Sequence, residues 1–221
     1  MISQLRPNYM HVLSLYNKTL EQRNNYLKQI KLEKKDENLL DIWDEKLIEY
    51  GLKIYEYRNE FIEKIKNKIK NIHKEITNNK EEIEIEYFSD AKTRQNFINE
   101  LKSRRNLDII KGFTTKGIHR DDFIIYINKK EVGIFGSQGQ NRTAMLSLKL
   151  SELQVIYDDI GEYPILLLDD FMSELDEKRR ASFLKNIKDI QVIITFTEKI
   201  TLENLKYFSY NVIDGDIYEK N

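Results

Sequence analysis

The sequence has no cysteine, so disulfides and thiolate metal sites are excluded, which fits a reducing compartment. No run approaches the roughly 20 apolar residues that a membrane-spanning helix needs, and the N-terminal residues lack the basic start and apolar run of a secretory signal. An excess of charge of one sign is also missing, because 36 basic and 37 acidic side chains leave a net charge of −1. Overall charge therefore gives no indication of nucleic-acid binding, and we expect a soluble, cytoplasmic protein.

Glycine and proline are scarce before residue 107, where only Gly51 and Pro7 occur. Apolar side chains at helical spacing predict a helix over 8–32. A second such stripe begins after Asp36, a plausible N-cap, and continues to Ile76. A helix of that length, charged on its other faces, is typical of an arm or of a hairpin of two helices. The alternation over 82–88 predicts a strand, and a further helix is expected over 90–105.

After residue 107 come seven glycines, Pro164 and most of the β-type runs. Here we expect strands, helices and a final β-turn-β with Asp214-Gly215 at its bend. The strands are predicted over 123–127, 131–135, 165–168 and 191–195, the helices over 140–159 and 176–187, and the β-turn-β over 208–218. The order strand, helix, strand over 165–195 predicts a parallel βαβ unit.

The run Gly-Ser-Gln-Gly-Gln-Asn-Arg at 136–142 has the composition of a glycine-rich turn that opens a helix. Its glycines let backbone N–H groups approach a ligand, and Ser137 is a natural N-cap. The N-terminus of the helix that follows favours an anion such as phosphate. An ordinary strand-to-helix turn capped by serine explains the run equally well.

The run Ile-Leu-Leu-Leu-Asp-Asp at 165–170 has the pattern of a buried strand that ends in two carboxylates. In α/β sheets, functional sites lie at the carboxyl ends of the strands. Of Asp169 and Asp170, one carboxylate can hold Mg²⁺, and a second beside it can polarise an attacking water. A strand that merely ends in an acidic turn is an equally good interpretation.

Three further features carry less information. Ser173 and Asp176 each suit the N-cap of the next helix. Arg120, in Gly-Ile-His-Arg-Asp-Asp at 117–122, is a possible phosphate or ion-pair clamp, although a charged turn is the simpler interpretation. His11 and His73 lie in helical patterns and are interpreted as surface or packing residues.

The order and spacing of these motifs identify a family. The run from Gly136 to Leu184 closely resembles RecF, a bacterial DNA replication and repair family in the ABC/SMC-type ATPase group. The resemblance continues through residues 117–123, where the family usually has proline at Ile118, and through the N-terminal helical run. It implies an α/β fold, with a partial ABC-type P-loop ATPase lobe (a parallel or mixed sheet with helices) over 107–221 and a helical arm over 1–106.

The resemblance also implies roles for individual residues. Residues 137–140 match the ABC signature, which contacts ATP held by the opposite subunit. These residues are Ser137, Gln138, Gly139 and Gln140. Asp169 matches the Walker B residue that orients Mg²⁺, and Asp170 the catalytic carboxylate. Ser173 and Asp176 match the D-loop. Thr197 lies at the switch position, where many relatives carry histidine and where threonine cannot take up charge.

The phosphate-binding pattern G-x-x-x-x-G-K-[S/T] does not occur in these 221 residues. We therefore expect the back part of a RecF-type protein, from a split or truncated gene or a shortened chain, that uses ATP and Mg²⁺ only with a Walker A-bearing piece. The isolated chain is expected not to hydrolyse ATP. The missing strands are expected to leave an exposed sheet edge.

The partners that the resemblance implies are single-stranded or gapped DNA, a second RecF-like subunit in an ATP-dependent dimer, and the mediators RecO and RecR. The implied work is recombinase loading at gaps and a part in the SOS response. The alternative is a non-enzymatic scaffold or truncated product that binds a protein partner or an intact RecF head. A head of the SMC kind fits less well, because the arm is too short. The lysine-rich stretch over 64–74 is interpreted as a solvated helix face in preference to a DNA contact, since glutamates are interleaved with the lysines.

Overall fold

The computed structural model describes residues 1–170, 176–197 and 206–219. The chain forms two compact units, Met1–Tyr163 and Pro164–Asn221, and each is described by itself. These units do not coincide with the division near residue 107 that the glycine content suggests. The reason is that a strand before residue 107 pairs with a strand after it, so both belong to one unit. No helix in the described part of the chain is long and apolar enough to cross a membrane.

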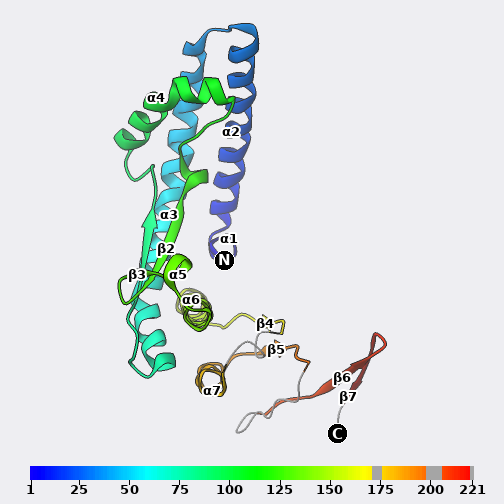
Figure 1. Ribbon diagram of the computed structural model, residues 1–221. Coiled ribbons are helices and arrows are strands. Elements are labelled where there is room, and N and C mark those ends of the chain that lie inside the picture. The colour runs from blue at the N-terminus through cyan, green and yellow to red at the C-terminus, as the bar shows by residue number, and fades with distance from the viewer. Residues whose placement is uncertain (171–175, 198–205, 220–221) are drawn as a thin grey trace. The chain divides into compact units, whose positions relative to one another are not determined.

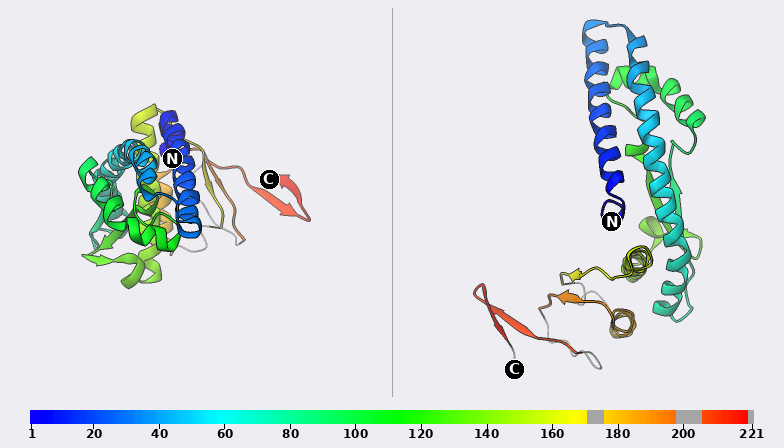
Figure 2. Two further views of the ribbon diagram at one scale, coloured as in Figure 1. Left: turned by 90° about the horizontal axis from the view of Figure 1, so that it is seen from above. Right: turned by 180° about the vertical axis from the view of Figure 1, so that it is seen from behind.

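The first unit begins with a helical hairpin. A short helix α1 (Ile2–Leu5) precedes α2 (Pro7–Glu33), which starts with proline in its first turn, where no backbone donor is needed. A 3₁₀ turn η1 (Glu37–Leu39), capped by the Asp36 side chain, leads into α3 (Leu40–Thr77). Helices α2 and α3 lie side by side (Figures 1 and 2). The apolar stripe predicted from residue 36 onward is thus a single helix of 38 residues.

Helix α4 (Arg94–Lys111) starts later and ends later than the predicted 90–105. The Thr93 side chain accepts a hydrogen bond from the Asn96 N–H and caps the start, and Gly112 ends the helix with φ 72°. Both are standard cap residues, so local chemistry sets the bounds where the apolar spacing is weak. A connection through the 3₁₀ turn η2 (Ile118–Arg120) then leads to the sheet.

The first unit contains one antiparallel sheet in the order β1–β2–β3. Strand β1 (Ile83–Phe88) pairs along its whole length with β2 (Asp122–Ile127), as Ile85 opposite Ile125 illustrates. The predicted strand over 131–135 is wrong: β3 is only Lys130–Glu131, and Val132–Phe135 forms the short helix α5. Gly133 in this run weakens a strand, and the Gly136 N–H closes the helical turn on the Val132 carbonyl.

Helix α6 (Gln138–Ile160) packs against the second half of α3, beyond the part that pairs with α2 (Figure 1). Isoleucines of α3 and of the sheet form one apolar cluster with small and branched side chains of α6. The cluster includes Ile65, Ile69, Ile85, Ala144 and Leu148. This packing places the start of α6 beside the segment that joins α3 to β1.

The second unit contains the predicted parallel pair. Strand β4 (Leu166–Leu168) pairs in parallel with β5 (Val192–Ile194), and α7 (Glu177–Asn186) lies between them in the sequence. The predicted terminal β-turn-β is also confirmed, as β6 (Tyr210–Ile213) and β7 (Asp216–Glu219). Asp214 and Gly215 both have positive φ at its bend, as a two-residue hairpin turn requires.

Candidate functional site

The start of α6 is organised by a capping box. The Ser137 hydroxyl accepts a hydrogen bond from the Gln140 N–H at 3.2 Å, and the Gln140 side-chain oxygen accepts one from the Ser137 N–H at 3.1 Å. The N–H groups of Gln138 and Gly139 lie in the first turn, where a helix offers no internal acceptor. A serine-capped helix start with outward-facing donors is therefore present at the predicted signature residues.

The Gln140 side chain also reaches out of the helix. Its amide nitrogen donates to a carboxylate oxygen of Glu81, in the segment between α3 and β1, at 3.1 Å. The other Glu81 oxygen lies 3.4 Å from Nε2 of His73, whose side chain is completely buried on α3. Nothing in the sequence pattern pointed to Glu81, and His73 is a packing histidine with a specific polar role.

His73 makes its second contact with α6 itself. Its Nδ1 lies 2.9 Å from the hydroxyl of Ser147, which donates to the Thr143 carbonyl. Thr143 in turn donates to the Gly139 carbonyl at 2.7 Å. Buried hydroxyls thus line the face of α6 that meets α3, and each donates its hydrogen bond to a backbone carbonyl one turn earlier in the helix.

In the second unit, the carboxyl ends of β4 and β5 hold Asp169, Asp170 and Thr195 together. The Thr195 hydroxyl donates a short hydrogen bond to Asp169 and accepts one from the Asp170 N–H at 3.1 Å. Asp170 has φ 46°, so the chain turns sharply after Asp169. The parallel pairing of β4 and β5 places Thr195 there, a residue that the sequence analysis did not single out.

The remaining predicted residues of the second unit have simpler surroundings. Asp176 is the N-cap of α7: its side chain accepts a hydrogen bond from the Arg179 N–H at 2.9 Å and pairs with the Arg179 guanidinium. Thr197 is exposed beyond the end of β5. Ser173 lies outside the described residues. The assignment of Asp176 and Ser173 to a D-loop and of Thr197 to a switch remains a prediction.

Arg120 lies on the surface, where its guanidinium is 5.9 Å from the centre of the Phe113 ring. The ammonium group of Lys111 lies at the same distance from this ring. His119, which precedes Arg120 in the sequence, is half-buried, and its Nδ1 lies 2.9 Å from the Tyr16 hydroxyl oxygen. Burial lowers the pKa of His119, so the ring is neutral near pH 7. The role of Arg120 as a clamp stays a prediction.

A buried ionic network that the sequence analysis missed stabilises the helical hairpin. Arg23 of α2 is fully buried and donates to Asp44 of α3 at 2.6 Å and to Asp108 of α4 at 2.8 Å. It also donates to the Thr114 hydroxyl at 2.8 Å. Because the charges come from three helices and the Thr114 hydroxyl comes from a loop, no local spacing in the sequence links these groups.

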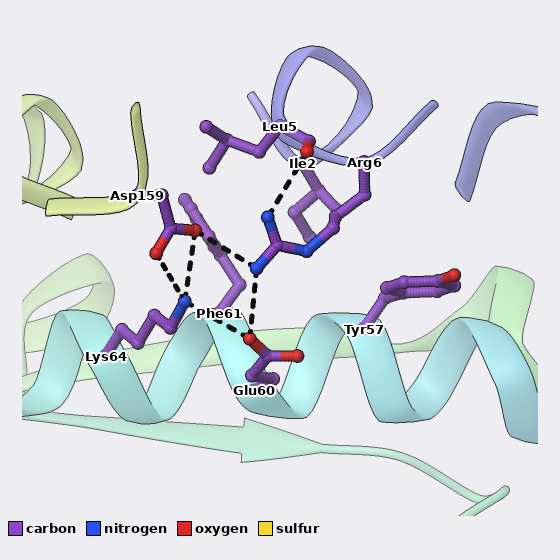
Figure 3. A pocket seen from close by; sticks show the side chains of 8 residues that line it. All are labelled: Ile2, Leu5, Arg6, Tyr57, Glu60, Phe61, Lys64 and Asp159. Atoms are coloured by element: carbon purple, nitrogen blue, oxygen red, sulfur yellow. Dashed lines mark hydrogen bonds and ion pairs between the residues drawn. The ribbon is translucent and has the colours of Figure 1, made fainter. Parts of the chain in front are cut away.

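A second ionic cluster joins α3 and α6 to Arg6, which lies between α1 and α2, and it lines a small pocket (Figure 3). Arg6 and Lys64 each pair with both Glu60 and Asp159, at distances between 2.7 and 3.3 Å. The hydrogen bond from Lys64 lowers the pKa of Asp159.

The lysine-rich stretch over 64–74 takes part in further pairs. Lys66 pairs with Glu63, and Lys68 with Asp158. These pairs support the interpretation of the stretch as a solvated, ion-paired face over its interpretation as a DNA contact.

Asp169 and Asp170 are compatible with Mg²⁺ but do not form a complete metal cage. Within residues 1–170, 176–197 and 206–219, no group of three or more His, Cys, Asp or Glu side chains could hold a metal ion. Mg²⁺ commonly keeps several waters and takes one or two carboxylates together with phosphate oxygens. Asp169 and Asp170 are suited to supply these one or two carboxylates.

The predicted residues thus form two separate constellations, one in each compact unit. Ser137–Gln140 lie in the first unit with Glu81 and His73. Asp169 and Asp170 lie in the second with Thr195.

The fold places the chain in a class of proteins, those with the ABC ATPase fold. The chain is similar to the solved structure of the recombination mediator protein RecF with ATP in the RecFOR pathway, with a TM-score of 0.86 and 40% identity over 100% of this chain and 60% of that one. A second solved structure, of RecF with an ATP analogue, gives a TM-score of 0.85 and 39% identity over 99% of this chain and 60% of that one.

Curated relatives give the particular family. The chain is 45% identical to the DNA replication and repair protein RecF of Clostridium perfringens, over 98% of this chain and 61% of that protein. It is 44% identical to RecF of Alkaliphilus oremlandii, over 93% of this chain and 58% of that protein. No family model matches the chain. The chain belongs to the RecF family, and it spans about three fifths of the length of these relatives.

Proposed function

We propose that this chain provides the signature helix and the Walker B strand of a RecF-type DNA repair ATPase. In this proposal ATP binds between two heads, and nucleotide binding controls the grip on DNA. The observation that carries it is the cluster at the ends of β4 and β5, where Thr195 bonds to both Asp169 and the Asp170 backbone. Such a cluster at the carboxyl ends of parallel strands supports a phosphate-linked function, and the similarity to RecF supports the same function.

Asp169 and Asp170 have different parts in this proposal. The Thr195 hydrogen bond fixes the Asp169 carboxylate, which has further lone pairs available for Mg²⁺ or for its bound waters. Mg²⁺, when bound, neutralises charge on the phosphates of ATP. Asp170 follows at the sharp turn of the backbone and would accept a proton from, or orient, the attacking water.

The start of α6 acts on ATP held by another subunit. Ser137 offers its hydroxyl, and the first turn of α6 offers N–H groups and the positive end of the helix dipole. A γ-phosphate would accept these hydrogen bonds, whereas a diphosphate is too short to reach them. This difference would make association of two heads depend on ATP. In this scheme the D-loop residues Ser173 and Asp176 and the switch-position residue Thr197 would sense the same interface.

The experiment uses the purified chain 1–221 with intact Clostridium perfringens RecF. We expect association in sedimentation velocity with a non-hydrolysable ATP analogue and at least tenfold weaker association with ADP. Ser137→Arg should abolish the difference, because the larger side chain covers the donors. Ser103→Arg, an exposed position on α4, is the matched control and should leave it intact. Association that ignores the nucleotide contradicts the proposal.

The same preparation tests the expectation about hydrolysis. The chain lacks the G-x-x-x-x-G-K-[S/T] pattern, so it should show no measurable ATP turnover by itself. Turnover by chain 1–221 that Asp170→Asn abolishes would contradict this expectation.

Binding of single-stranded or gapped DNA, cooperation with RecO and RecR, recombinase loading and a part in the SOS response complete the proposal. They belong to the whole RecF-type protein, of which this chain is a part. The lysine-rich face over 64–74 does not support DNA binding, because Lys64, Lys66 and Lys68 form ion pairs. Arg120 and Lys111 around Phe113 are a better candidate for a phosphate contact.

A non-enzymatic scaffold is the second candidate, and one observation favours it. Leu167 and Ile193 lie opposite one another on β4 and β5 and are 70% and 55% exposed. Such an apolar surface suits a protein partner. The two candidates differ in the experiment above, since a scaffold associates equally well with ATP analogue, with ADP and without nucleotide.

A further inference from the structure

Both polar atoms of the Gln140 side-chain amide form hydrogen bonds. The oxygen accepts from the Ser137 N–H inside the capping box, and the nitrogen donates to Glu81 outside α6. A change at Glu81 therefore acts directly on the side chain that shapes the Ser137 turn. A capping box needs only the first of these bonds, so the second requires a separate explanation.

Glu81 belongs to the segment that leaves α3 and enters β1. Helix α3 ends at Thr77, and the strand begins at Ile83. Through one carboxylate oxygen Glu81 contacts Gln140 of α6, and through the other it faces Nε2 of the buried His73 on α3. The carboxylate thus joins the end of the long arm helix to the start of the signature helix.

His73 lies on the other side of this connection. Its Nδ1 lies 2.9 Å from Ser147 of α6, and its ring is completely buried between the helices. Because one ring contacts both Glu81 and α6, the position of Glu81 is set relative to α6 and to α3 at once. A rotation of α3 against α6 would separate Glu81 from Gln140.

We propose that Glu81 is a positioning residue for the signature motif. It transmits the position of α3 to the Ser137 turn through Gln140, with His73 as its support. The inference rests on the proposed nucleotide contact of Ser137–Gln140 and adds a regulatory link: movement of the helical arm loosens the turn that contacts the phosphate of ATP. Conversely, a nucleotide that orders the turn favours one position of α3.

The test measures amide hydrogen exchange in the chain 1–221. In Glu81→Ala the N–H groups of Ser137 and Gln140 should exchange about tenfold faster, because the capping box loses the charge-assisted bond that holds Gln140. Glu81→Gln keeps an acceptor for the Gln140 amide and should stay within about threefold of the parent chain. If Glu81→Gln exchanged as fast as Glu81→Ala, the role of this hydrogen bond would be overturned.

Glu82→Ala is the matched control. Like Glu81→Ala, it removes one negative charge, but it does so from the exposed side chain of the next residue. The Glu82 backbone keeps its bonds to Asn128. Exchange at 137–140 should not change in this variant. Equal acceleration in both variants, or acceleration spread evenly over α3 and α6 in Glu81→Ala, shows a general loss of stability and overturns the proposal.

A double-mutant cycle gives a readout that a merely structural role would not move. In a Gln140→Ala background, Glu81→Ala should no longer change exchange at Ser137, because the link is already broken. If the effects of Glu81→Ala and Gln140→Ala on exchange at Ser137 add fully, the proposal is overturned.

The nucleotide experiment separates this inference from the proposed function. Glu81→Ala should weaken the association with intact RecF that the ATP analogue produces by about tenfold, while Glu82→Ala leaves it unchanged. Lack of association by the parent chain defeats the proposed function, whereas the exchange result decides the role of Glu81 by itself. An exchange difference without any effect on a demonstrated association overturns the link to nucleotide.

Discussion

Arg23 illustrates how single residues determine the packing of the helical hairpin. Its guanidinium is completely buried and bonds to carboxylates on two other helices, Asp44 and Asp108. Burying three charges is costly, and the cost is repaid only while every partner is present. The network therefore makes the arrangement of α2, α3 and α4 specific.

Replacing Arg23 should be strongly destabilising for this reason. We expect Arg23→Ala to lower the free energy of unfolding by about 3–5 kcal/mol, since two carboxylates lose their buried partner. Arg94→Ala removes a surface pair with Glu45 and should cost under about 1 kcal/mol. Urea unfolding followed by fluorescence of Trp43, the single tryptophan, measures both. Equal costs would contradict a special role for the buried network.

Among the elements, the contact of α6 with α3 and with the segment between α1 and α2 depends on charge as well as on apolar packing. The Asp159 side chain, near the end of α6, is 14% exposed and pairs with Arg6 and Lys64 (Figure 3). Its neighbour Asp158 is 51% exposed and pairs with Lys68. The two adjacent aspartates thus offer a comparison of a shielded with an open ion pair on one helix.

Asp159→Asn should lower the free energy of unfolding by about 1 kcal/mol at low ionic strength, and Asp158→Asn by less than half of that. Screening by 1 M salt should remove most of the difference in unfolding free energy between these two variants. Because the pKa of Asp159 is lowered in the folded chain, its contribution is present above about pH 4 and is lost as the pH falls through that pKa. Denaturant unfolding at pH 7 and pH 3 in both salts checks this. An effect of Asp159→Asn that is as large at pH 3 as at pH 7 would contradict the assignment to charge.

At the scale of the whole chain, the exposed apolar residues of the second unit are notable. Ile165, Leu167 and Ile193 are each more than half exposed around the two-stranded sheet β4–β5. A parallel strand of such composition is normally covered on both faces. The chain spans about three fifths of its relatives' length, and we expect residues of a longer RecF-type protein, or a partner, to cover this surface.

The isolated chain 1–221 should therefore self-associate. We expect sedimentation velocity to show mass increasing with concentration, and Leu167→Lys to weaken the association about tenfold, as the loss of one buried leucine contact implies. Leu32→Lys changes a residue on α2 that is 80% exposed and serves as the matched control. A monomeric parent chain, or equal effects of both variants, would contradict the prediction.

Local chemistry explains which features could be predicted. The Ser137 cap and the turn at Asp214-Gly215 each depend on residues close together in the sequence, and the order strand, helix, strand indicated the parallel pair around α7. The predicted strand over 131–135 failed because its apolar residues, with Gly133 among them, also suit a short helix. The bounds of α4 were missed because its apolar spacing is weak, although Thr93 and Gly112 mark them.

The sequence by itself determined the elements that cap, turn and alternate locally, and its motifs determined the family, because these properties depend on neighbours along the chain. Tertiary packing alone decided that Glu81 meets Gln140 and His73, that Thr195 meets Asp169 and that Arg23 meets Asp108. Each of these contacts joins residues from different elements or connections. Long-range contacts of this kind depend on how helices and strands pack, which no local pattern of residues specifies.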